Sequence, residues 1–207
     1  MTAGTTRFMA YTSPLTCFPA IGHWVLALDQ GHWQLEAWEN FVKSTDRNRY
    51  WLHSHQDTFR LSLPVAGGRS QKTPIQALLL DETTPWREQH LTIIRNAYAA
   101  SPFFEDFFPE IETCYRNGSN HLFEFNLELF HYCREWLCPD LTWSLTSSWQ
   151  GPYPAASPNL ELPSYFRPFP LQNPHDVARL SVLDLLFQEG PWAAVWLEEA
   201  VKFYRTR

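Results

Sequence analysis

The sequence lacks the short motifs that mark the commonest cofactor and hydrolase chemistries. It contains no P-loop, no GxGxxG fingerprint, no GxSxG nucleophile elbow and no HExxH pair. Its four cysteines form no CxxC pair and no dense disulfide pattern, so reduced thiols are expected. We therefore expect neither an organic cofactor nor a metal site, and the indications of function lie in less specific groups of polar and charged residues.

Positive charge and long apolar runs are also scarce. There are 16 Lys and Arg against 22 Asp and Glu, which gives a net charge of −6. This balance argues against a nucleic-acid partner, although it leaves room for a local basic pocket that holds one or two phosphates. No apolar run approaches the roughly 20 residues of a membrane span, and the polar N-terminus is not followed by a signal-type apolar core. We expect a cytoplasmic protein without a membrane span; its oligomeric state is not indicated.

What the chain has in abundance is apolar and aromatic side chains. Apolar residues make up 44% of the 207 positions, and aromatic residues make up 16%, with ten tryptophans. This length and composition predict one domain over residues 1–207 with a sizeable core. The many rings either line a cleft, where Trp and Tyr find polar partners, or fill the core.

The first third of the chain predicts a parallel strand pair followed by a hairpin. A strand within residues 8–17 is followed by a helix that opens at Phe18-Pro19 and ends at Gly31, and then by a strand over 32–38. Such a crossover unit normally makes a parallel pair. Residues 50–55 and 58–65 have hairpin spacing. Residues 67–72 form a polar loop, which is either a flap or a connection, and 74–80 is expected to be a strand.

The remainder is mostly helical. Helices are predicted over 85–99, from Ser101-Pro102 to a break at Pro109, from Pro109 onward, over 120–137, over 181–188 and over 191–204. Residues 141–145 read as a strand, and the proline-rich segment 150–175 is either a linker or an ordered excursion over the surface. Together these elements predict an α/β (or α+β) domain with a small mixed sheet and helices packed on it.

Charged residues gather in the segment 36–49, directly after the second predicted strand. Its polar members are Glu36, Glu39, Lys43, Arg47, Asn48 and Arg49. The cations could hold phosphate or carboxylate, while the carboxylates could hold sugar hydroxyls or take a proton. Ligands tend to bind beyond the carboxyl ends of strands in α/β sheets. The alternative is a solvated charge run that pairs with itself.

Six further positions have a structural as well as a functional interpretation. His90 shares a helical stripe with Trp86 and is either a core histidine or an acid–base group. Asn126 lies beside an apolar stripe, where its amide must find partners. Asp184 is either the N3 residue of a capping box whose N-cap is Ser181 or a ligand-binding carboxylate. His53 and His55 lack a third ligand, and Cys17 reads as a small buried residue.

These residues resemble the WbqC-like protein family over roughly residues 15–200. The similarity runs through Phe18-Pro19-Ala-Ile21, Glu36-Ala-Trp-Glu39-Asn-Phe-Val-Lys43 and Arg47-Asn48-Arg49. It continues through Trp86-x3-His90, Phe125-Asn126 and the segment from Leu180 to Pro191. Cys17 stands where the family pattern has Tyr, and Trp38 where it has His.

The resemblance implies a cytoplasmic step of cell-surface polysaccharide (O-antigen) biosynthesis, because the family is named after genes of that pathway. The first hypothesis is a transferase that modifies a nucleotide-activated sugar, with His90, Glu39 and Glu36 in catalysis. Lys43, Arg47, Asn48, Arg49, Trp86, Asn126 and Asp184 would bind that small-molecule ligand. Arg47→Ala is then expected to remove ligand binding at little cost in stability. The alternatives are a non-catalytic sugar- or nucleotide-binding protein and a protein-interaction module.

Overall fold

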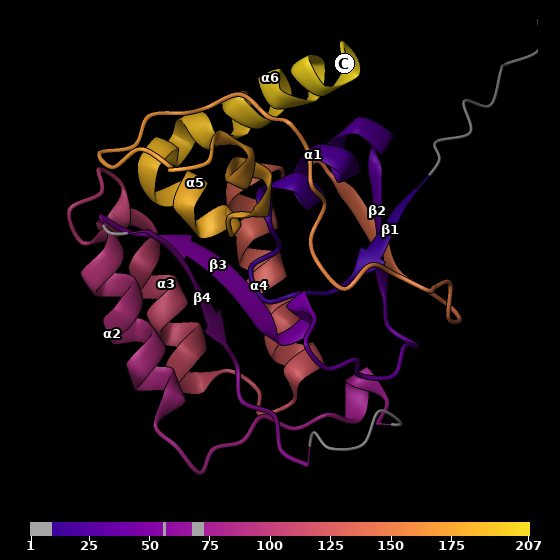
Figure 1. The fold of residues 1–207 in the computed structure, drawn as a ribbon. Coiled ribbons are helices and arrows are strands. Elements are labelled where there is room, and N and C mark those ends of the chain that lie inside the picture. Colours follow the sequence, from indigo (N-terminus) through magenta and orange to yellow (C-terminus); the bar gives the residue numbers. More distant parts are fainter. Residues whose placement is uncertain (1–9, 56, 68–72) are drawn as a thin grey trace, which may run out of the picture.

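A parallel sheet lies on one side of the molecule, as the N-terminal pattern predicts (Figure 1). A computed structural model describes residues 10–55, 57–67 and 73–207. In it, β1 (Tyr11–Pro14) leads through α1 (Ile21–Gln30) to β2 (His32–Glu36), and β1 and β2 pair in parallel. Strand β5 (Thr142–Leu145) pairs in parallel with the other edge of β2. The carboxyl ends of all three strands therefore meet at one edge.

A hairpin forms a second, two-stranded sheet. Strands β3 (Arg49–His53) and β4 (Thr58–Ser62) pair antiparallel, which confirms the predicted hairpin, although turn residue 56 lies outside the described residues. The side chains of Tyr50, Leu52 and Leu61 face the core, and Arg49, Trp51 and Arg60 occupy the opposite face. The predicted flap or connection at 67–72 also lies outside the described residues except for Gly67.

Helices surround both sheets. They are α2 (Trp86–Tyr98), α3 (Phe104–Asn117), α4 (Leu122–Leu137), α5 (Val182–Glu189) and α6 (Ala193–Arg205). Figure 1 shows α2 and α3 beside the hairpin and α1 between the parallel sheet and α6. The buried apolar residues form one continuous core, in which Trp24 of α1 meets Trp33 of β2 edge-on at 5.0 Å. The α/β class with helices packed on a small set of strands is confirmed.

The end of α1 and the start of α5 follow the local signals in the sequence. Gly31 ends α1 in the left-handed conformation (φ 74°), and its N–H bonds to the Ala27 carbonyl at 2.9 Å. Ser181 caps α5 by accepting the N–H of Leu183 at 3.2 Å. The cap thus forms, while the Asp184 side chain is engaged elsewhere.

Two element predictions were wrong. Residues 74–80 contain the 3₁₀ turn Ile75–Ala77 instead of a strand, because Pro74, Leu79 and Leu80 bridge three different segments and no ladder can extend. Helix α3 runs through Pro109 without a break and begins at Phe104, so Ser101 does not cap it. The buried stripe of Phe104, Phe108 and Ile111 outweighs the one hydrogen bond that a proline removes.

The proline-rich segment is an ordered excursion. Residues 146–173 form no helix or strand, and the 3₁₀ helix Pro174–Arg179 follows them. In Figure 1 the segment, in orange, runs from the side of the parallel sheet past α1 toward α5. Its backbone is tied to the rest of the chain by hydrogen bonds at Gln150, Pro154, Ala155 and Ser157. None of the helices in the described ranges is long and apolar enough to cross a membrane.

Candidate functional site

A pocket of about 370 Å³ lies beside β1 and beyond its carboxyl end. One wall is β1 with His23 and Leu26 of α1, and the facing wall is the irregular segment 153–159. Asp46 and Arg47 close the side between these walls. Ligand sites of this size are commonly lined by apolar groups with a few fixed polar ones, and the position matches the sheet edge where α/β proteins bind ligands.

His23 and Tyr11 form a hydrogen-bonded pair in the pocket wall. Tyr11 Oη and His23 Nδ1 are 2.6 Å apart. Burial, assisted by the positive charge of Arg47, lowers the pKa of His23 to about 3, and burial raises the pKa of Tyr11. At neutral pH the phenol is therefore protonated and the imidazole is neutral, and the phenol donates to Nδ1 in the tautomer that carries the ring proton on Nε2. In that tautomer Nε2–H makes no hydrogen bond with any described residue and can donate to a ligand.

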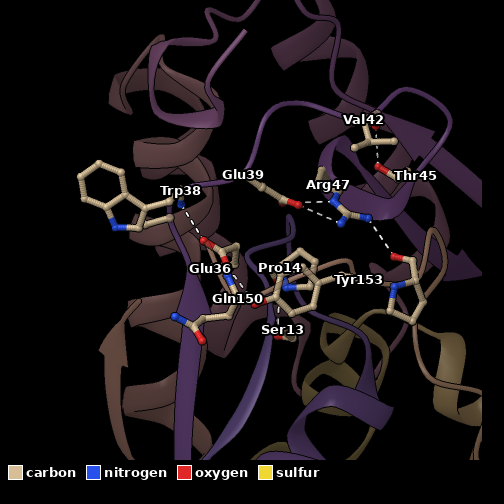
Figure 2. A network of polar contacts seen from close by, with 12 residues as sticks. Ser13, Pro14, Glu36, Trp38, Glu39, Val42, Thr45, Arg47, Gln150 and Tyr153 are labelled. Carbon is tan, nitrogen blue, oxygen red and sulfur yellow. Dashed lines mark hydrogen bonds and ion pairs between the residues drawn. The ribbon is translucent and has the colours of Figure 1, made fainter. Parts of the chain in front are cut away.

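Arg47 joins the pocket to a buried ion pair. Its Nε and Nη2 donate to the two carboxylate oxygens of Glu39 at 3.1 and 2.9 Å, and its Nη1 donates to the Pro154 carbonyl at 2.8 Å. Figure 2 shows the Arg47 guanidinium beside the Glu39 carboxylate. Burial raises the pKa of Glu39, against the opposing effect of Arg47. Three of the five N–H groups of Arg47 donate to described residues, and the other two have no partner among them.

Glu36 is fully engaged at the carboxyl end of β2. Its side chain accepts from the backbone N–H groups of Trp38 (2.7 Å) and Gln150 (2.9 Å) and from the hydroxyls of Thr146 (2.9 Å) and Tyr153 (2.8 Å). Burial alone would raise the pKa of Glu36, but these four donors outweigh it and the pKa is lowered. Glu36 thus fixes the start of the proline-rich segment. The Trp38 ring extends away from the Glu36 carboxylate (Figure 2).

Asp46 holds the far wall of the pocket. Its Oδ2 accepts from the backbone N–H of Ser157 at 2.7 Å and from the Ser157 hydroxyl at 2.8 Å, and its own N–H bonds to the Ala155 carbonyl at 3.0 Å. The acidic residues of segment 36–46 and Arg47 therefore clamp residues 150–157 over the pocket. The sequence alternative of a charge run that pairs with itself holds for Glu39 and Arg47, though the pair is buried rather than solvated.

The other residues of the 36–49 segment lie around this clamp. Asn48 Nδ2 donates to the Leu63 carbonyl at 2.7 Å and ties the clamp to the end of β4. Lys43 is exposed, and Arg49 is half-buried on the hairpin face. Nδ2 of Asn126 in α4 donates to the Arg47 carbonyl at 2.9 Å and so holds the backbone of the site at Arg47.

His90 and Trp86 lie apart from the pocket wall. Nδ1 of His90 is 3.1 Å from the Tyr50 hydroxyl, and the ring packs edge-on against Trp86 at 5.3 Å. Burial lowers the pKa of His90 to about 4. Both side chains belong to the aromatic cluster between α2 and the hairpin.

Asp184 forms a separate buried centre. It accepts from the hydroxyls of Tyr98 (2.9 Å) and Tyr165 and pairs with Arg167, whose Nε is 2.8 Å away. These contacts fasten the later part of the proline-rich segment to α5. Within the part of the chain that the structure describes, no group of three or more His, Cys, Asp or Glu side chains could hold a metal ion.

Sequence reasoning missed His23, Tyr11, Asp46 and Tyr153 as members of the site. A histidine among apolar residues in the helix that follows the first strand was an available signal for His23. Tyr153 and the wall at 153–159 could not be found, because irregular backbone carries no periodicity that predicts where it packs.

Fold and site together define an α/β protein with a pocket of about 370 Å³ at the edge of a parallel sheet. A family model described as the WbqC-like protein family matches residues 16–163. The chain belongs to this family, as the resemblance of its motifs predicts. No curated protein and no solved structure matches the chain.

Proposed function

We propose that this protein is a cytoplasmic enzyme of cell-surface polysaccharide (O-antigen) biosynthesis, a transferase that modifies a nucleotide-activated sugar bound in the His23 pocket. The observation that carries the proposal is the neutral His23 imidazole, held by Tyr11 and facing a pocket of about 370 Å³. Membership of the WbqC-like family supports the pathway.

The charge of the pocket favours the sugar part of such a ligand over its phosphates. Glu39 neutralises Arg47, and the carboxylate of Asp46 is occupied by Ser157. A sugar ring offers apolar faces to the walls and hydroxyls to the few fixed donors, which are His23 Nε2–H and the two free N–H groups of Arg47.

In this proposal the donor that acts on the reacting oxygen is His23 instead of His90. An N–H group aimed at an acyl carbonyl or a sugar hydroxyl stabilises charge that develops on that oxygen, and its fixed position costs no reorganisation. Glu39, Glu36 and Asn126 act as positioning residues through Arg47 and segment 150–157.

A thermal-shift screen against nucleotide-activated sugars, acyl and aminoacyl donors and free nucleotides tests the binding. A ligand at 100 times its Kd adds about 2.7 kcal/mol, which raises the Tm of a domain of this size by several degrees. We expect the shift to fall sharply in His23→Asn and in Tyr11→Phe and to persist in His121→Asn, a control on an exposed histidine. Equal shifts in all three variants would place the ligand elsewhere.

A non-catalytic sugar-binding protein is the second candidate, and one observation favours it. The pKa of His23 is lowered to about 3 and that of Glu36 is also lowered, so neither group is an efficient base near pH 7. Incubation of the tightest-binding sugar with each donor, followed by mass spectrometry, separates the two. A product that wild type forms and His23→Asn does not supports the transferase, whereas binding without any product supports the binding protein.

A further inference from the structure

Two arginines of the β3–β4 hairpin stand out because they have no acidic partner among the residues that the structure describes. Among the described residues, every other arginine is within 4 Å of a carboxylate, as Arg47 is with Glu39. Arg49 and Arg60 form no ion pair within that part of the chain, in a protein whose net charge is −6. Unpaired cations are unusual where carboxylates are in excess.

The register of the hairpin brings these arginines to one face. Arg49 pairs with Ser62 and Trp51 pairs with Arg60, so the two arginines are diagonal neighbours on the side turned away from the core. Arg60 is exposed, while Nε of Arg49 is buried without a hydrogen-bond partner. Burial and the charge of Arg60 both lower the pKa of Arg49. The negative charge of Asp46 opposes this shift in the pKa, but Oδ2 of Asp46 already accepts a hydrogen bond from Ser157.

A third arginine completes the face from another element. Arg179, at the end of the 3₁₀ helix Pro174–Arg179, stacks its guanidinium on the Trp51 ring at 3.4 Å, and Arg60 lies 5.5 Å from the same ring. The carboxylate nearest to Arg179 is Asp176, at 3.9 Å. Stacking on Trp51 positions both guanidiniums without using their N–H groups, and the only carboxylate contact of either one among the described residues is the 3.9 Å contact of Arg179 with Asp176.

We propose that Arg49, Arg60 and Arg179 form a phosphoryl-anion site, distinct from the His23 pocket, that takes the diphosphate of an activated sugar. Arginine binds phosphoryl oxygens with two parallel N–H donors, and three such forks match the several oxygens of a diphosphate. The assignment of this diphosphate to an activated sugar rests on the proposed function, whereas the anion site itself does not. The diphosphate belongs either to a nucleotide or to a lipid carrier, since the arginines would bind it alike.

The test uses inorganic pyrophosphate and isothermal titration calorimetry on the full chain at low salt. Wild type is expected to bind, and Arg60→Gln to bind about tenfold or more weakly, because a charge-assisted contact is lost. The double change Arg49→Gln with Arg60→Gln should abolish measurable binding. Arg116→Gln, which removes an exposed arginine of α3, is the matched control and should bind like wild type.

Absence of pyrophosphate binding by wild type, or equal affinity of Arg60→Gln and Arg116→Gln, would overturn the proposal. Arg60 is exposed, so its single change keeps the test valid even where the double variant does not fold. Comparing the affinities of a nucleoside diphosphate and a short prenyl diphosphate distinguishes the two sources. Tighter binding of the first indicates a nucleotide, and tighter binding of the second indicates a lipid carrier. Tyr11→Phe should leave the affinity for pyrophosphate unchanged. Loss of sugar binding in the His23 pocket is therefore distinguishable from loss of anion binding at the three arginines.

Discussion

Arg47 is the residue on which the contacts of the candidate site converge. It binds Glu39 with two donors, holds the proline-rich segment through Pro154 and has its own carbonyl held by Asn126. The sequence identifies Arg47 and Glu39 as site candidates because they belong to a charged segment that follows a predicted strand, and Asn126 because an amide beside an apolar stripe needs partners. It does not say that they are partners of one another, since 79 residues separate Arg47 from Asn126 along the chain.

The buried pair changes the expected effect of Arg47→Ala. From the sequence, this change costs little stability, but in the structure it leaves the Glu39 carboxylate buried without its cation. We predict a loss of about 3–5 kcal/mol in the free energy of unfolding, measured by urea denaturation. Replacing both partners, as Glu39→Leu with Arg47→Met, should recover a large part of that loss. Equal stabilities of wild type and Arg47→Ala would show that the pair is not formed as described.

At the scale of elements, the site depends on one irregular segment held against regular ones. Strand β1 and helix α1 follow strong local signals, which is why the crossover unit is predictable from sequence. Segment 150–157 is held by contacts with Glu36, Asp46 and Arg47, which come from more than 100 residues earlier in the chain. Such contacts leave no local pattern. Long-range packing also overrides a local signal in α3, where burial of Phe104 and Phe108 keeps the helix continuous through Pro109.

Asp46→Ala is predicted to loosen the pocket wall without unfolding the protein. The change removes both hydrogen bonds from Ser157, worth about 1.5–3 kcal/mol each because the acceptor is charged. We expect chymotrypsin to cut after Leu160, a cleavable site just beyond Ser157, at least several times faster, with fragments identified by mass spectrometry; the bond after Tyr153 resists the enzyme because Pro154 follows it. Asp140→Ala, on an exposed carboxylate, is the control. Unchanged cleavage in Asp46→Ala would mean that Asp46 does not hold the segment.

At the scale of the whole molecule, buried neutral histidines couple folding to pH. The pKa values of His23 and His90 fall from 6.5 in the unfolded chain to about 3 and about 4 in the folded protein. Between pH 6.5 and these values the unfolded state binds protons that the folded state does not, so stability decreases as the pH falls. The lowered pKa of Glu36 acts in the same direction at lower pH, and the raised pKa of Glu39 opposes it.

Urea denaturation between about pH 7 and about pH 4.5 measures this coupling. Each histidine contributes up to about 1.4 kcal/mol per pH unit, so we predict that His23→Asn has a slope shallower by up to that amount. If the slopes of wild type and His23→Asn coincide, His23 is not the buried neutral group that the fold implies.

The central claim is that His23 presents a neutral N–H donor to a ligand, and nitrogen-15 NMR of the histidine rings tests it most directly. The spectrum is recorded with and without the compound that gives the largest thermal shift, and His23 is assigned from the His23→Asn variant. The account predicts an uncharged ring with the proton on Nε2 from about pH 7 to about pH 5, and a change in the Nε2 signal when the ligand binds. A His23 ring that titrates near pH 6.5, or one whose signals ignore the ligand, would contradict it.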